Sequence, residues 1–363
     1  MASCRGSFRA LLLYNIAEAI ELDALRRTFG TEPAGREPSF AHPAPEYVRF
    51  ERPPAVEPLP PFQTSTGHHW QGRLKYYDYG VVSAELEHFF EIGWEELVHL
   101  SAAWIGAAEI EQLALGFVRD RVKPIGATLI KPYPEWLNED YYIVHLRDAV
   151  DDRGAPYTAQ GLLAAHGHDL ARLVRGETQL LSDQETAEVL RASISYYPND
   201  LLVAGWFSAF VYDSPPSAVP TIQLLEYANT QLLEYRHYDE LLTRLLSGVY
   251  KSLERHAGPF ARWRLAREAE RLNTLRLDIT ELAERTDNSI KFLSDLFYAR
   301  QYRVMAERVG VGDYRRLVDD KLRTAGELYQ FMMNEFHQGR AFVLELMVVV
   351  ILIIDLIYLF RGH

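Results

Sequence analysis

The chain has 363 residues, of which 48% are hydrophobic and 24% are charged, a composition typical of a folded globular protein. Its single cysteine excludes a disulfide framework and a cysteine-rich zinc module. The formal charge of −12 is uneven, because residues 1–250 contain 20 Lys and Arg against 34 Asp and Glu, whereas residues 251–340 contain 17 against 14. The acidic first part argues against direct nucleic-acid binding, which requires clustered positive charge.

The first residues combine strand, helix and loop patterns. Residues 8–14 are an apolar run typical of a strand, and residues 22–29 show helical spacing. Nine prolines between residues 31 and 67 predict a long surface loop. Aromatic and β-branched residues at 72–87 predict a strand, or a hairpin that turns at Tyr79-Gly80.

This alternation continues to about residue 215. The helical spacing of residues 94–122 is interrupted near Gly106, and Ser182 with Glu185 three positions later is a capping box that begins a helix. A further helix is predicted at residues 162–174, and strands are predicted at 141–146, 193–197 and 201–212. Residues 1–215 are therefore predicted to form an α/β head, and the chain as a whole belongs to the α+β class.

Residues 216–340 are predicted to form a stalk of long antiparallel helices. An apolar stripe with a period near 3.6 begins at Ala218 and ends before Gly258. A second long helix follows, and it carries a heptad seam that is interrupted at Thr286 and Ser289. Polar seam positions can set the register or the partner of a coiled coil, and a helix cap or kink at Asn288 is the alternative. The seam residues are Leu272, Leu275, Ile279 and Leu282.

The clearest pattern is the apolar run AFVLELMVVVILIIDLIYLF at residues 341–360. Twenty helical residues extend about 30 Å, the thickness of the hydrocarbon core of a bilayer. Glu345 and Asp355 interrupt the run and could contact an identical neighbouring helix, while Tyr358 and Arg361 suit the membrane interface. We expect a single transmembrane helix here. The alternative is a buried helix of a soluble bundle.

The position of this run predicts the topology. It ends three residues before the end of the sequence, and Arg5 and Arg9 precede an apolar segment too short for a signal peptide. These features predict a tail-anchored protein of the bacterial inner membrane, with its N-terminal domain in the cytoplasm.

Few residues suggest catalysis. No phosphate-binding loop, nucleophile elbow or paired-cysteine motif is present. His166, His168 and Asp169 are a weak metal candidate and are better explained as a solvated helix start. A second polar group suggests an ion network between head and stalk, or partly an i,i+4 pair of Arg236 with Glu240. Its members are Asn229, Glu234, Arg236 and Asp239.

Three short segments resemble the "required for meiotic nuclear division" family, whose bacterial relatives form a domain of unknown function. They are Tyr79-Gly80-Val81-Val82, Arg271–Leu282 and the apolar segment opened by Leu344-Glu345. The resemblance implies a membrane-tethered, oligomeric scaffold, since the mitochondrial relatives support translation at the inner membrane, and it supplies no catalytic residue. The proline-rich insertion and the lack of a presequence argue against a mitochondrial role for this chain.

We therefore expect a non-enzymatic scaffold that associates with itself and docks a protein complex at the membrane, with a translation-related complex as a candidate. The expected partners are other proteins, the lipid bilayer and further copies of the chain; no cofactor is expected. The alternative is an oligomeric ion channel similar to the CorA type, with Asp355 near the pore. A single membrane helix and the missing Gly-Met-Asn motif count against the channel. A hydrolase using Glu234 and Asp239 lacks a nucleophile.

Overall fold

The computed structural model describes residues 4–29, 48–50, 53–150, 154–254, 261–288, 290–292 and 296–361. Within these ranges, backbone alone is described at 29, 48–50, 252–254, 261–266, 285–288, 290–292, 296, 335–346, 355 and 358–361. The chain divides into two compact units: Met1–His237 with Arg285–Tyr314, and Tyr238–Glu284 with Arg315–His363.

Ten strands are described. They are β1 (Cys4–Ile20), β2 (Val48–Phe50), β3 (Ala55–Gln63), β4 (His69–Tyr76), β5 (Val81–Ile92), β6 (Leu129–Ala149), β7 (Ser193–Ile194), β8 (Leu201–Ala204), β9 (Ser208–Tyr212) and β10 (Ile290–Phe292).

The described helices include one short 3₁₀ helix, η1 (Lys123–Thr128). The α-helices are α1 (Leu22–Phe29), α2 (Trp94–Trp104), α3 (Ala108–Val122), α4 (Ala159–Arg175), α5 (Asp183–Leu190), α6 (Pro215–Glu254), α7 (Ala261–Asn288), α8 (Leu296–Val309) and α9 (Val311–Arg361).

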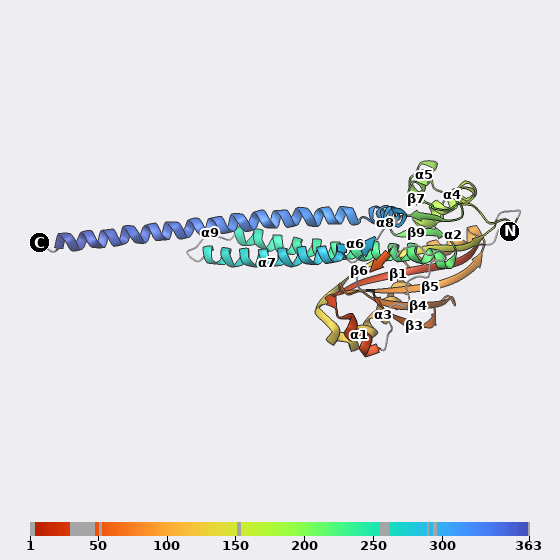
Figure 1. Cartoon of the computed structure of the whole chain (residues 1–363), viewed down its shortest axis with the longest axis horizontal. Coiled ribbons are helices and arrows are strands. Elements are labelled where there is room, and N and C mark those ends of the chain that lie inside the picture. The colour runs from red at the N-terminus through yellow and green to blue at the C-terminus, as the bar shows by residue number, and fades with distance from the viewer. Residues whose placement is uncertain are drawn as a thin grey trace. The chain divides into compact units, whose positions relative to one another are not determined.

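Eight strands form one mixed sheet in the order β3-β4-β5-β1-β6-β9-β8-β7 (Figure 1). Every neighbouring pair is antiparallel except β6 and β9, which run parallel. Strands β2 and β10 form a separate two-stranded pair. A largely antiparallel sheet followed by long helices confirms the α+β class.

One face of the sheet forms the main apolar core. Phe8, Leu74 and Leu86 occupy positions on this face and are buried in the same cluster as side chains of α1, α2 and α3. Helix α3 contributes a stripe at every fourth residue, which places four side chains on one helix face. These are Ile110, Ala114, Val118 and Val122.

The hairpin of β4 and β5 confirms the predicted turn at Tyr79-Gly80. Gly80 has φ +93°, and a Cβ atom there would lie 1.8 Å from the carbonyl oxygen of Ala17. Only glycine fits such a left-handed residue in so close an approach. The break in the predicted helix at 94–122 is also confirmed, because α2 and α3 are separated at Gly106, whose φ is +69°.

Two expectations in the first unit are wrong. Residues 55–63 belong to the predicted proline-rich loop but form edge strand β3, which pairs with β4. An edge strand tolerates proline because it does not need every backbone N–H for pairing. Residues 31–47 and 51–52 of that loop lie outside the described ranges. The predicted single strand at 201–212 is instead two strands, β8 and β9, which turn at residues 205–207.

The second unit packs parts of α6, α7 and α9 around a small apolar core. Leu246 and Val249 of α6 share this core with Ala269 and Leu272 of α7. Both pairs lie close to the connection between the two helices, so α6 and α7 form an antiparallel hairpin. Ala325 and Met332 place α9 in the same core.

The predicted second helix is interrupted more strongly than its pattern indicated. Helix α7 ends at Asn288, β10 follows, and α8 begins only at Leu296. The prediction of one helix with a polar break is therefore wrong, and the helix ends at Asn288, the residue where the alternative placed a cap or kink. Gly310, with φ +89°, then separates α8 from α9 as the glycine pattern predicted.

The backbone of residues 341–360 is helical and belongs to α9. Among the residues that the structure describes, none of the helices has both the length and the apolar character that crossing a membrane requires.

Candidate functional site

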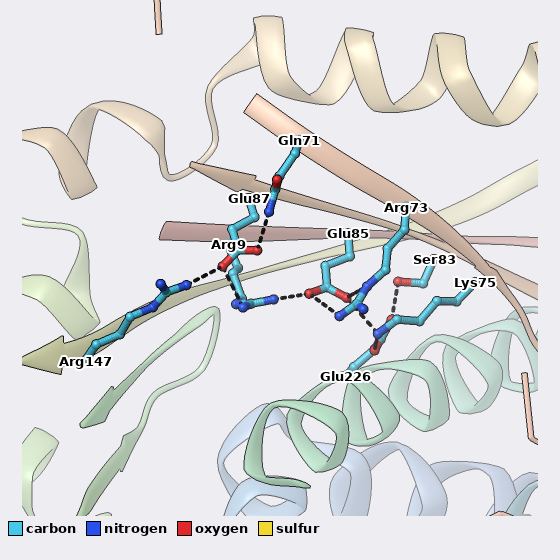
Figure 2. A network of polar contacts seen from close by, with 9 residues as sticks. All are labelled: Arg9, Gln71, Arg73, Lys75, Ser83, Glu85, Glu87, Arg147 and Glu226. Atoms are coloured by element: carbon cyan, nitrogen blue, oxygen red, sulfur yellow. Dashed lines mark hydrogen bonds and ion pairs between the residues drawn. The ribbon is translucent and has the colours of Figure 1, made fainter. Parts of the chain in front are cut away.

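A network of charged side chains lies on the sheet face opposite the main apolar core (Figure 2). Side chains alternate between the two faces of a strand, so Arg9 follows Phe8 onto the other face and Glu85 separates Ala84 from Leu86. Helix α6 contributes one member of the network from outside the sheet. The members are Arg9, Gln71, Arg73, Lys75, Ser83, Glu85, Glu87, Arg147 and Glu226.

Glu85 is the central acid of the network, and its side chain is only 2% exposed. Its carboxylate accepts two hydrogen bonds from Arg73, from Nε at 2.7 Å and from a terminal nitrogen at 2.9 Å. Lys75 Nζ lies 2.8 Å away, and Arg9 also pairs with it. Burial alone would raise the pKa of Glu85, but Lys75, Arg73 and Arg9 together hold that pKa well below its usual value.

Glu226 connects α6 to the sheet. Its carboxylate pairs with Lys75 Nζ and accepts a hydrogen bond from Ser83 Oγ at 2.6 Å. Lys75 therefore bridges a carboxylate of the sheet and a carboxylate of the helix. One turn further along α6, Tyr79 Oη lies 2.8 Å from Thr230 Oγ1. Burial, followed by the nearby carboxylate of Glu226, raises the pKa of Tyr77 well above its usual value.

Glu87 forms the other end of the network. It pairs with Arg9 at 2.6 Å and with Arg147 at 3.6 Å, and it accepts a hydrogen bond from Gln71 at 3.2 Å. The guanidinium of Arg147 lies 4.5 Å from the ring centroid of Phe89. The Arg147 side chain at this end is 27% exposed, whereas the Lys75 side chain beneath α6 is 8% exposed.

Each carboxylate of the network is matched by cations at contact distance. Such an arrangement holds α6 in one register on the sheet. A shift of the helix would separate the ion pairs and leave a buried charge without its partner, which is strongly unfavourable. Among the described residues, no group of three or more His, Cys, Asp or Glu side chains could hold a metal ion. The chemistry of this network is that of a structural latch between helix and sheet.

The four residues predicted for a head–stalk network fall into both units. In the first unit, Asn229 is buried and donates to the Leu225 carbonyl at 2.8 Å, and Glu234 is also buried. Arg236 pairs with Glu139 of β6. Burial raises the pKa of Glu139, and Arg236 opposes this shift. Arg236 therefore pairs with a residue of the sheet, Glu139.

Asp239 belongs to the second unit, where it pairs with Lys321 of α9 at 2.5 Å. Glu234 and Asp239, the two carboxylates weighed for hydrolysis, are thus placed in different units. Glu345, Asp355, Tyr358 and Arg361 lie on the backbone of α9, and their side chains are outside the described part of the chain.

His166 is not at a solvated helix start, as its sequence suggested. It lies inside α4 at a kink with φ −128° and ψ 20°. Its ring stacks on Trp94 at 4.0 Å between centroids, and its two nitrogens lie 3.2 Å from Asp169 Oδ2 and from Tyr157 Oη. The half-buried His166 side chain therefore has its ring and polar contacts within the head.

The charge network was missed at the sequence level. The alternation in Ser83-Ala84-Glu85-Leu86-Glu87 predicts a strand with one polar face, and such a face usually meets water. A signal was nevertheless present in α6, because Glu226 lies next to the apolar stripe of Ile222, Leu225 and Ala228. An acid beside a buried stripe needs a cation on the surface that it meets.

Comparison with known proteins defines the family. A family model described as "Uncharacterized protein MJ0711, N-terminal domain" matches residues 5–218, more than half of the chain. The chain therefore belongs to this family, and the resemblance to the "required for meiotic nuclear division" family is wrong. Its three matching segments are short, and two of them lie within the long helices α7 and α9.

A curated relative carries the same name. The chain is similar to the uncharacterized protein MJ0711 of Methanocaldococcus jannaschii, with 19% identity over 188 residues. The match covers 52% of this chain and 58% of that protein, so the chain spans little more than half of its length. No solved structure matches the chain.

Proposed function

We propose that the chain is a non-enzymatic scaffold, anchored to the cytoplasmic membrane through the end of α9, which associates with further copies and holds a protein complex there. In this proposal the head of residues 1–215 faces the cytoplasm and residues 216–340 form the stalk. No cofactor is needed, and the acidic head favours protein partners over nucleic acid.

The observation that carries the proposal is the exposed aliphatic surface near the end of α9. Ten described side chains there are between 46% and 60% exposed. They are Met347, Val348, Val349, Val350, Ile351, Leu352, Ile353, Ile354, Leu356 and Ile357. Consecutive positions cover every side of a helix, so this stretch presents apolar surface all round.

An apolar surface of this kind is unfavourable in water, at about 25 cal/mol for each Å². Contiguous apolar patches larger than a few hundred Å² mark interaction sites or membrane contacts. Further copies of the helix could cover one side, but lipid covers all sides at once. The run at 341–360 has the length that about 30 Å of hydrocarbon requires.

The latch described above supports the role of α6 in a scaffold. Helix α6 contributes residues to both units, and Glu226 fixes its first part to the sheet through Lys75 and Ser83. A scaffold needs such a fixed attachment more than it needs a reactive group.

Alkaline extraction of membranes tests the anchor. Membranes from cells that produce the full chain are washed with carbonate, and we expect the protein to stay in the pellet. The double variant Val350→Asp, Ile354→Asp should move to the supernatant, because two charges oppose insertion by about 5–7 kcal/mol. Phe331→Asp, an exposed position on the same helix before the run, is the matched control and should stay in the pellet. Release of the unaltered protein would contradict the anchor.

The channel alternative stays a prediction. It depends on Asp355, whose side chain lies outside the described residues. Ion flux through the reconstituted protein that Asp355→Ala abolishes would favour the channel over the scaffold.

A further inference from the structure

Three strongly exposed aromatic side chains flank strand β8 in the first unit. Tyr196 and Tyr197 precede the strand and Trp206 follows it, and they are 60%, 56% and 56% exposed. Phe297 at the start of α8 contacts Tyr196, with 4.8 Å between the ring centroids. Single exposed aromatics are common, but a group on one side of a molecule indicates an interaction site.

Helix α8 connects these side chains into one surface. It begins beside Tyr196, and its end leads to Gly310, where an added Cβ atom would lie 3.4 Å from the Trp206 ring. Its exposed Arg300 and Arg303 lie between these two points. We call the six residues the aromatic–arginine surface: Tyr196, Tyr197, Trp206, Phe297, Arg300 and Arg303.

The backbone that presents the two tyrosines is held firmly. Asp200 Oδ1 accepts hydrogen bonds from the backbone N–H groups of Tyr196 at 2.7 Å and Tyr197 at 3.2 Å. The carbonyl of Pro198, the residue after Tyr197, accepts a hydrogen bond from the Ala159 N–H at 2.7 Å. Rigid aromatic side chains on a fixed turn lose little entropy on binding, and Tyr, Trp and Arg are the residue types that dominate binding energy at protein interfaces.

The net charge of α8 is opposite in sign to that of residues 1–250. Helix α8 carries Arg300, Arg303 and Arg308 against Glu307, a net charge of +2, whereas residues 1–250 have 14 more acidic than basic residues. Arg308 pairs with Glu188, 3.3 Å away. The guanidinium of Arg300 lies 5.6 Å from the Phe297 centroid, within the range of a cation–π contact.

We propose that the aromatic–arginine surface docks a segment of a partner protein that carries acidic side chains next to aliphatic or aromatic ones. The positive charge selects the acidic residues, and the exposed rings supply the apolar contact. This inference rests on the proposed scaffold function and deepens it, because it names the docking surface and the chemistry of the docked partner. A basic segment would be repelled by Arg300 and Arg303.

Photo-crosslinking of the full chain in its membranes tests the docking surface. The photoreactive amino acid p-benzoylphenylalanine replaces Tyr196 in one variant and Trp206 in another. Phe89 is the matched control position, because it is 45% exposed and also carries an arginine, Arg147, over its ring. We expect crosslinks to a partner protein at 196 and 206 several-fold stronger than at 89. The crosslinked peptides should have a net negative charge.

A second variant checks the charge. Arg300→Ala combined with Arg303→Ala changes two exposed side chains and should reduce the crosslinks at 196 and 206 several-fold, as should higher salt. Equal crosslinking at position 89 overturns the proposal. Crosslinks mainly to lipid, to nucleic acid or to a second copy also overturn it, and so do partner peptides without acidic residues.

Carbonate extraction of the same membranes separates this proposal from the scaffold anchor. A chain that stays in the pellet but yields no specific crosslink overturns the docking surface and leaves the anchor standing. A chain that is released but still crosslinks to an acidic segment overturns the anchor and leaves the docking surface standing.

Discussion

One face of the eight-stranded sheet meets α2 and α3 through apolar side chains, whereas the opposite face, which meets α6, carries the charge network beside buried apolar side chains such as Leu11 and Leu13. Leu86 and Glu85 are neighbours in β5 and represent the two faces, and both are buried. Apolar contacts are non-directional and tolerate small shifts of a helix. Ion pairs and hydrogen bonds require defined positions, so the charged face fixes the placement of α6, the helix that continues into the second unit.

The largest effect should come from Glu85→Ala. It leaves Lys75, Arg73 and Arg9 around a buried position without their shared acid and should reduce the free energy of unfolding by ~3–5 kcal/mol. Leu86→Ala on the other face should cost a similar ~2–5 kcal/mol through lost burial and a cavity. Chemical denaturation followed by circular dichroism measures both.

Their pH dependence distinguishes the two faces. Because the folded protein lowers the pKa of Glu85, its contribution is present above the unfolded value near 4.5 and is lost as the pH falls through the folded pKa. The difference in the free energy of unfolding between the unaltered protein and Glu85→Ala should therefore become smaller in acid. The corresponding difference for Leu86→Ala should not. Equal behaviour of both variants in acid would contradict the described role of the ion pairs.

A smaller net effect should come from two neighbouring groups close to the start of α6, because their contributions to the pH dependence oppose each other. His145 Nε2 donates to the Asp213 carbonyl at 3.0 Å. Burial lowers the pKa of His145 from 6.5 to about 4 and raises the pKa of Asp213 from 3.8 to about 6. Between these limits the buried histidine makes stability rise with pH, because the unfolded state binds more protons, and the buried acid makes it fall.

Substitutions should separate these opposing contributions. As the pH rises from about 4 to 6.5, Asp213→Asn should gain stability relative to the unaltered protein, and His145→Gln should lose relative stability. Thermal unfolding at several pH values measures both. Two variants with the same direction of change would contradict the assigned shifts.

The smallest effect, about 1 kcal/mol, should come from Thr230→Val. This change keeps the shape of the side chain but removes the partner of Tyr79 Oη at 2.8 Å. Thr230→Ser is the matched control, because it changes the same position. Serine keeps the hydroxyl and should restore most of the lost stability; equal loss in both variants would mean that the hydrogen bond contributes nothing.

Local patterns in the sequence predicted much of the fold. The helix start at Ser182 is confirmed, since its side chain accepts from the Glu185 N–H at 3.2 Å, and the turn at Tyr79-Gly80 and the break at Gly106 are confirmed as well. These features depend on neighbours in sequence. The pairing of β6 with β9 and the position of α6 over Lys75 depend on residues 60 or more positions apart, which periodicity does not reveal.

The same limit explains the candidate site. Glu226 and Lys75 are separated by 151 positions, so neither residue indicated the other. The sequence suggested that Arg236 pairs with Glu240, four positions later on the same helix, but the structure pairs Arg236 with Glu139. A sequence shows which residues can meet within one helix. It does not show that packing brings Arg236 to a more distant and more buried partner.

Strand β3 has a consequence for how copies of the chain can meet. It forms one border of the eight-stranded sheet, and three of its nine residues are proline: Pro58, Pro60 and Pro61. Proline has no amide hydrogen to donate, so another strand added at this border would lack several hydrogen bonds. The sheet is thereby guarded against growing from one molecule into the next, a useful safeguard for a protein expected to gather many copies in a small area.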